Sequence, residues 1–176
     1  MHVILAHKDN ANEQLLRDHA YNTASLAREA AHEIGQGDVL FLLGLFHDIG
    51  KADPLFQQKL TTNPDTHVDH SYAGARYTFT NIMQIHGYDV FTDTIAYVIA
   101  AHHGMFDLYE PEVIYSNKLF ARMNLKEGYD YATVENFAKE LESELPHYGY
   151  RDLKHLIEKA YQNYQDATNK LHPKDE

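Results

Sequence analysis

Apolar residues recur along this chain with a period close to that of an α-helix, which predicts helices nearly throughout. Residues 12–34 have apolar or small side chains at positions such as Leu16 and Ala20, the spacing that one face of a helix requires. Gly35 interrupts this pattern. We expect Asp38 to cap the N-terminus of the helix that follows.

The most apolar stretch of the chain, residues 39–49, is apolar on all sides until His47 and Asp48. All of residues 39–46 are apolar apart from one glycine, so we expect the central buried helix of the domain here. Gly50 and Asp53-Pro54 break the pattern, and Pro54 suits the first turn of a short helix that runs to Leu60.

The second half of the chain repeats the helical pattern. Further helices are predicted at residues 70–85, 92–103, 110–125, 131–145 and 152–171. Gly87 and Gly104 end the first two of these helices, and we find no convincing alternating pattern of a strand. The pattern therefore predicts a single all-α domain with about seven or eight helices.

Composition and charge limit the classes of function. The 176 residues, 44% of them hydrophobic, suit one globular domain, and without cysteine any metal must be held by histidine and carboxylate side chains. The formal net charge of -11 counts against a broad basic face for nucleic acid, but not against an enzyme that binds divalent ions. We expect a cytoplasmic protein without a membrane partner, because the N-terminus lacks a signal-peptide pattern and residues 39–46 are too few to span a bilayer.

The 13 histidines are the unusual feature of the composition. His19 lies on the inward stripe of the first predicted helix, and His47-Asp48 closes the apolar one. A buried carboxylate is costly unless it is paired. Either Lys51, one turn later, forms an ion pair with Asp48, or a divalent ion binds Asp48 and the adjacent histidine together.

Three more histidines lie at the ends of later helices. His70 opens the helix at residues 70–85, where an exposed histidine near the helix cap is the alternative to a ligand. His102 and His103 close the helix at residues 92–103, on positions that follow its apolar stripe. Imidazole and carboxylate ligands suit Mn, Fe, Co, Ni or Zn and, with waters, Mg. A carboxylate between two groups of histidines can bridge two ions that promote in-line attack of water on a phosphodiester.

In chain order, these residues resemble the motifs of the HD superfamily of metal-dependent phosphohydrolases. The matching residues are His19, His47-Asp48-Ile49-Gly50-Lys51, His70 and His102-His103. Phe56-Gln57 and the glycine after the paired histidines narrow the resemblance to the HD nuclease domain of the CRISPR type I interference nuclease-helicase. The similarity runs from about Asp18 to Gly104.

The resemblance implies an HD-type helical domain that cleaves single-stranded DNA with one or two divalent ions, which we expect to be Mn, Ni, Co, Fe, Mg or Zn. The implied ligands are His19, His47 and Asp48 for the first ion, and Asp48, His70, His102 and His103 for the second. Asp48 bridges the ions and Lys51 lies beside the substrate phosphate, so these two are the expected catalytic residues.

The same resemblance implies that a superfamily 2 helicase domain, fused or separate, and the CRISPR surveillance complex are partners. We therefore expect residues 1–176 to be an HD nuclease domain that is a fragment of, or a partner to, a larger helicase-containing protein. The family pattern ends in an Ala-Asp element whose aspartate completes the first metal site. Asp107, Asp152 and Asp166 do not resemble it, so either the chain is cut before that helix or a water completes the site.

Two other functions remain open from the residues alone. An HD phosphohydrolase of nucleotides or cyclic nucleotides shares the metal chemistry, and in a non-catalytic interaction module the histidines only stabilise the helices. The segment Tyr148-Gly149-Tyr150-Arg151 either stacks on bases or packs against the start of a helix. The other histidines are expected to be solvated: His2, His7, His32, His67, His86, His147, His155 and His172.

Overall fold

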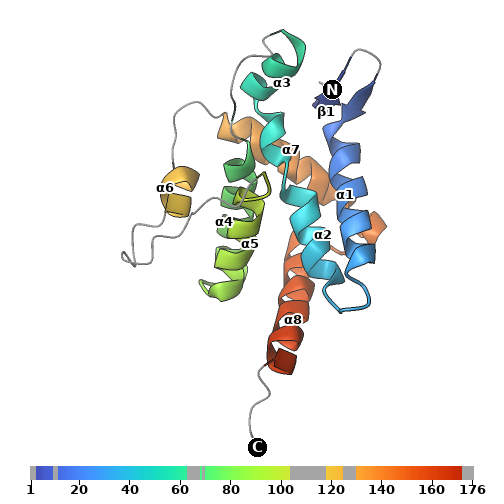
Figure 1. The fold of residues 1–176 in the computed structure, drawn as a ribbon, viewed down its shortest axis with the longest axis vertical. Helices are drawn as coiled ribbons and strands as arrows, with labels where there is room; N and C mark the ends of the chain where they lie inside the picture. The colour runs from blue at the N-terminus through green and yellow to red at the C-terminus, as the bar shows by residue number, and fades with distance from the viewer. Residues whose placement is uncertain are drawn as a thin grey trace, which may run out of the picture.

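The computed structural model describes residues 3–9, 12–62, 68, 70–103, 118–124 and 130–171. Within these residues the chain forms eight α-helices, two short 3-10 helices and one two-stranded sheet (Figure 1). The prediction of an all-α domain is therefore confirmed. None of the described helices combines the length and the hydrophobicity that a bilayer crossing requires.

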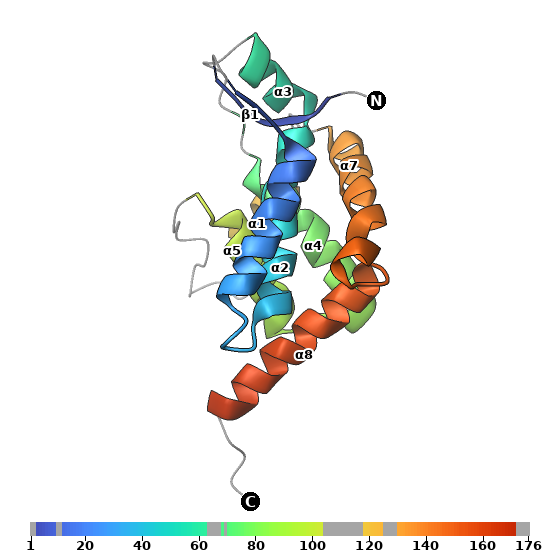
Figure 2. The ribbon, with the colours of Figure 1, turned by 90° about the vertical axis from the view of Figure 1, so that its right-hand side faces the viewer.

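The N-terminal region differs from the prediction, because a β-hairpin precedes the first helix. Strand β1 (Leu5–Lys8) pairs antiparallel with β2 (Glu13–Leu15), and α1 (Leu16–Ala30) begins only after the hairpin. A four-residue strand with the burial pattern buried-buried-exposed-exposed is too short to show alternation. The hairpin lies at the same end of the molecule as α3 (Pro54–Thr61) in both views (Figures 1 and 2).

The predicted central helix is confirmed as α2 (Gly37–Phe46). Its Phe41, Leu42, Leu45 and Phe46 are fully buried. The expectation that Asp38 caps this helix is wrong, because the helix begins at Gly37, one residue before Asp38, and Gln36 occupies the cap position. The carboxylate of Asp38 instead accepts a hydrogen bond from the hydroxyl of Tyr150 at 2.6 Å.

The remaining α-helices agree with the predicted ranges to within about three residues wherever they are described. They are α3, α4 (Ser71–His86), α5 (Val90–Ala100), α6 (Lys118–Asn124), α7 (Tyr131–Glu144) and α8 (Leu153–Leu171). The two 3-10 helices, η1 (Ile49–Ala52) and η2 (Leu145–Tyr148), were not predicted. The part of the predicted helix before residue 118 lies outside the described residues, as do Gly104, Asp107, His2, His67 and His172.

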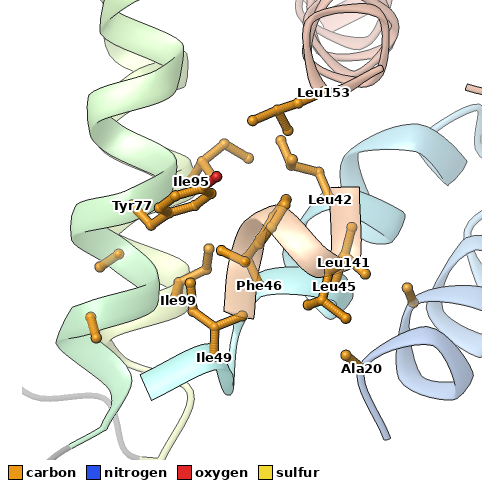
Figure 3. Close-up of a cluster of buried hydrophobic side chains, with 14 of the residues drawn as sticks. Ala20, Leu42, Leu45, Phe46, Ile49, Tyr77, Ile95, Ile99, Leu141 and Leu153 are labelled. Atoms are coloured by element: carbon orange, nitrogen blue, oxygen red, sulfur yellow. The ribbon is translucent and has the colours of Figure 1, made fainter. Parts of the chain in front are cut away.

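The core is built around α2. Phe46 lies in one cluster with Tyr77 of α4, Ile99 of α5 and Leu141 of α7 (Figure 3). Leu153 of α8 lies near Leu42 at the other end of this cluster (Figure 3). The end of α2, where His47 and Asp48 follow, is therefore held rigidly between α1 and the α4–α5 pair.

The tyrosines of residues 148–151 pack inside the protein. Tyr150 is 1% exposed, and the ring of Tyr148 stacks on that of Tyr21 with the centroids 4.3 Å apart. Of the two predicted roles, packing against a helix start is correct, and burial leaves Tyr150 no face for a base.

Asp53 links η1 to the starts of α3 and α7. It is fully buried, its Oδ1 accepts from the backbone N–H of Leu55 at 2.7 Å, and its Oδ2 accepts from that of Asp130 at 2.6 Å. Asp53→Ala removes the cap of α3 and the acceptor for the backbone N–H groups of Leu55 and Asp130. We expect a loss of about 2 kcal/mol in the free energy of unfolding, measured in urea. A loss below about 0.5 kcal/mol, the level of an ordinary surface substitution, would contradict this role.

Candidate metal centre

Asp48 is the centre of a cluster of imidazole rings. It lies two residues after the end of α2, and only 3% of its surface is exposed. Its Oδ2 lies 2.9 Å from Nε2 of His19 and 3.1 Å from Nε2 of His47. Its Oδ1 lies 3.2 Å from Nε2 of His70 and 3.3 Å from Nε2 of His102. Each oxygen of the carboxylate thus faces a different set of histidines.

Two groups of possible metal ligands result, and we name them the first and second groups. In each, the ligand atoms lie within 4.8 Å of one another. The first group is His19, His47 and Asp48, and the second is Asp48, His70, His102 and His103. The structure therefore brings together all six residues that the sequence indicated as metal ligands. Asp48 belongs to both groups.

Different elements supply these side chains. His19 comes from the middle of α1, while His47 and Asp48 lie between α2 and η1. His70 directly precedes α4, and His102 and His103 follow α5. Asp152 and Asp166 lie on or beside α8 and belong to neither group within the described residues.

Backbone hydrogen bonds set the tautomer of two of the rings. Nδ1 of His47 lies 2.7 Å from the carbonyl oxygen of Gly44, and Nδ1 of His102 lies 2.6 Å from that of Ile99. A carbonyl can only accept, so Nδ1 donates its proton in both rings. In the neutral ring Nε2 then keeps its lone pair toward Asp48, the orientation that metal-ligating histidines adopt.

The same cluster contains buried polar atoms that no protein group satisfies. Within the described residues, Oδ1 of Asp48, Nε2 of His102 and Nδ1 of His70 have no hydrogen-bond partner. Nε2 of His103 lies only 2.7 Å from Nε2 of His70, and at most one of these two nitrogens can accept. Of these atoms, Oδ1 of Asp48 and Nε2 of His102 are two acceptors that face each other at 3.3 Å, which is unfavourable without a cation. Nitrogen and carboxylate ligands in this number therefore fit divalent ions.

The protonation states also suit metal binding. Burial raises the pKa of Asp48, but the contacts from His102, His19, His47 and His70 outweigh it and hold this pKa well below its usual range. Partial burial and the neighbouring rings of His102 and His70 lower the pKa of His103. Ionised carboxylate and neutral imidazole are the forms that bind metal ions.

Lys51 lies on η1, next to the Asp48 carboxylate of the first group. Its Nζ is 2.8 Å from Oδ2 of Asp48, and the residue is 4% exposed. The ion pair that the sequence suggested is therefore present, next to the ligand groups. The role of Lys51 beside a substrate phosphate stays a prediction.

Two residues contact the cluster in ways that the sequence did not indicate. His7, expected to be solvated, lies on β1 with its ring edge-on to that of His19, the centroids 5.2 Å apart. Phe56 of α3 contacts the ring of His70 in the same manner, at 4.9 Å. For His7 no sequence pattern indicates this contact, because β1 is short, its burial does not alternate, and its pairing is irregular between Leu5 and His7.

Two glycines permit close approach around the ligands. A Cβ atom on Gly74 would lie within 3.0 Å of the backbone oxygen of Phe46, which is directly before His47. A Cβ atom on Gly50 would lie 2.9 Å from Cα of His70 and closer still to its carbonyl group. These contacts bring the start of α4 against the end of α2 and against η1.

A comparison with protein-family models finds a match to the family described as HD domain, over residues 16–159. The matched region contains all six candidate ligands and Lys51. No curated protein matches the chain significantly.

Proposed function

The chain belongs to the HD domain family, whose members are metal-dependent phosphohydrolases, and we propose that it is a nuclease that cleaves single-stranded DNA. The observation that supports this most directly is the position of Asp48, with one oxygen toward each ligand group. A carboxylate in this position suits two ions that act together on one phosphodiester.

Divalent ions held by the two groups would stabilise the attacking and leaving oxygens of the phosphodiester and lower the pKa of an attacking water. The positions of the ligand side chains determine where hydrolysis can occur. Asp48 is fixed by burial, and the backbone hydrogen bonds of His47 and His102 fix two of the rings. His103 is the exposed member of the second group, so we propose that the substrate approaches from its side. Lys51 supplies a positive charge that can bind a phosphate oxygen.

The finer assignment, to CRISPR interference, rests on the resemblance in Phe56-Gln57 and in the paired histidines. We propose that a superfamily 2 helicase domain, fused or separate, and the CRISPR surveillance complex are partners of residues 1–176. The formal net charge of -11 supports such a partner, because an acidic domain binds DNA weakly at physiological salt unless another protein supplies a basic channel.

One observation favours a different class of function. The ion pair between Lys51 and Asp48 neutralises the buried carboxylate without a metal. In a non-catalytic interaction module this pair and the histidine contacts would only stabilise the fold. Metal binding separates the two functions, because the module needs none.

Incubation with a single-stranded DNA oligonucleotide and Mn²⁺, Ni²⁺ or Co²⁺ tests the proposal. We expect shortened products on a denaturing gel with each metal and none with excess chelator, because the ligand groups must be filled for hydrolysis. His32→Ala, an exposed position at the end of α1, is the matched control and should cleave normally. Hydrolysis of mononucleotides or cyclic nucleotides without cleavage of the oligonucleotide would assign the nucleotide phosphohydrolase instead. No metal binding and no hydrolysis would assign the module.

A further inference from the structure

Phe56 contacts a ligand of the second group. It is buried on α3, with 5% of its surface exposed, and its ring meets that of His70 at an interplanar angle of 66°. Unlike His47 and His102, His70 has no backbone carbonyl that fixes its ring, since its buried Nδ1 has no hydrogen-bond partner within the described residues. The contact with Phe56 therefore takes the place of that hydrogen bond.

Gln57, the next residue on α3, fastens the hairpin to η1. Its Oε1 accepts from the backbone N–H of Leu5 at 3.0 Å, and its Nε2 donates to the carbonyl oxygen of Leu5 at 2.9 Å. The same Nε2 donates to the carbonyl oxygen of Lys51 at 2.6 Å. One side chain thus occupies both backbone groups of Leu5 and sets the position of β1 relative to the metal centre.

From Leu5, strand β1 continues to His7, which pairs with Gln14 of β2 and lies edge-on to His19 at an interplanar angle of 86°. In the described part of the chain the hydrogen bonds of the His19 ring both involve Nε2, and the ring of His7 packs edge-on against it. Gln57 therefore affects the first group indirectly, because it holds the strand that carries His7.

We propose that the adjacent residues Phe56 and Gln57 are positioning residues for the metal centre, one for each ligand group. Phe56 sets the ring of His70 in the second group, and Gln57, through His7, sets that of His19 in the first. Neighbouring residues on a helix diverge by about 100°, which allows one α3 turn to serve both groups. This inference rests on the proposed metal-dependent function and explains why the pair follows the histidine-aspartate element so closely.

Mn²⁺ binding by the full chain, measured by calorimetry in two variant backgrounds, tests whether each residue acts on one ligand group. His102→Ala leaves the first group intact, and His19→Ala leaves the second. Residues behind metal ligands typically contribute about 10- to 100-fold to affinity. We expect Gln57→Leu to weaken Mn²⁺ binding about tenfold in the His102→Ala background and less than about twofold in the other. Phe56→Leu should show the reverse pattern.

Gln58→Leu is the matched control, because this neighbouring side chain is exposed and has no side-chain hydrogen bond in the described structure. It should change neither affinity. Thermal unfolding with chelator shows whether each variant folds. If Gln57→Leu does not fold, His7→Ala at its exposed strand position makes the same test, and His7→Phe, which keeps a ring against His19, should restore affinity.

Equal losses in both backgrounds, or no loss in either, would overturn the positioning roles while the proposed function stands. If His7→Phe binds Mn²⁺ as weakly as His7→Ala does, the nitrogens of His7 act directly, and the ring-packing role is wrong. Failure of the unsubstituted chain to bind Mn²⁺ would overturn both proposals. Tight binding of Mn²⁺ without DNA cleavage would overturn only the proposed nuclease.

Discussion

Asp48→Asn should abolish cleavage of single-stranded DNA and weaken Mn²⁺ binding at both ligand groups. The two oxygens of Asp48 face different groups, and the substitution replaces one oxygen with an amide nitrogen that has no lone pair to offer. It also removes the negative charge that balances the ions. We expect Asp48→Asn to lose several kcal/mol of transition-state stabilisation, which lowers the cleavage rate by about a thousandfold or more.

Three measurements on this variant separate the possible causes of the loss. Calorimetry with Mn²⁺ reports binding, a gel assay reports cleavage, and thermal unfolding with chelator reports whether the fold persists. Asp166→Asn is the control, because this acid of α8 is exposed and belongs to neither group in the described structure. Cleavage at the normal rate by Asp48→Asn would contradict a metal-dependent role, and a change in stability alone would support the non-catalytic module.

The helices could be predicted because each has a buried stripe that is visible in the sequence. The apolar run before His47 gave α2, and the Asp53-Pro54 pair gave the start of α3 to the residue. The hairpin could not be predicted, because side-chain hydrogen bonds from Gln57, more than fifty residues later, hold its Leu5. Local periodicity carries no information about such distant contacts.

The six candidate ligands could be recognised for a similar reason. His47, His70 and His102 lie where a helix begins or ends, and a polar residue beside an apolar stripe is conspicuous there. The sequence did not reveal which oxygen of Asp48 faces which histidine, because that depends on how α1, α4 and α5 approach the end of α2. It missed His7 because a ring contact across two segments leaves no local pattern.

Gly50→Ala should lower the free energy of unfolding by about 3 kcal/mol and weaken metal binding with it. A Cβ atom at this position would lie 2.8 Å from the carbonyl carbon of His70 and 2.9 Å from its Cα. Real Cβ contacts are essentially never shorter than 3.0 Å, and the obstructing atoms are backbone atoms that no rotamer change can move. Relief of the clash requires η1 and the start of α4 to separate.

That separation would displace His70 from Oδ1 of Asp48, so stability and metal affinity should fall together. Urea unfolding and Mn²⁺ calorimetry measure the two losses. Gly37→Ala is the control, since its nearest neighbours are atoms of Arg28 at 3.3 Å, one of them in a flexible side chain, and we expect a change below about 1 kcal/mol. Gly50→Ala with unchanged stability would show that the backbone of η1 can move freely. Packing then explains the glycine two residues after Asp48, because only a residue without a side chain lets His70, just before α4, reach the carboxylate of Asp48.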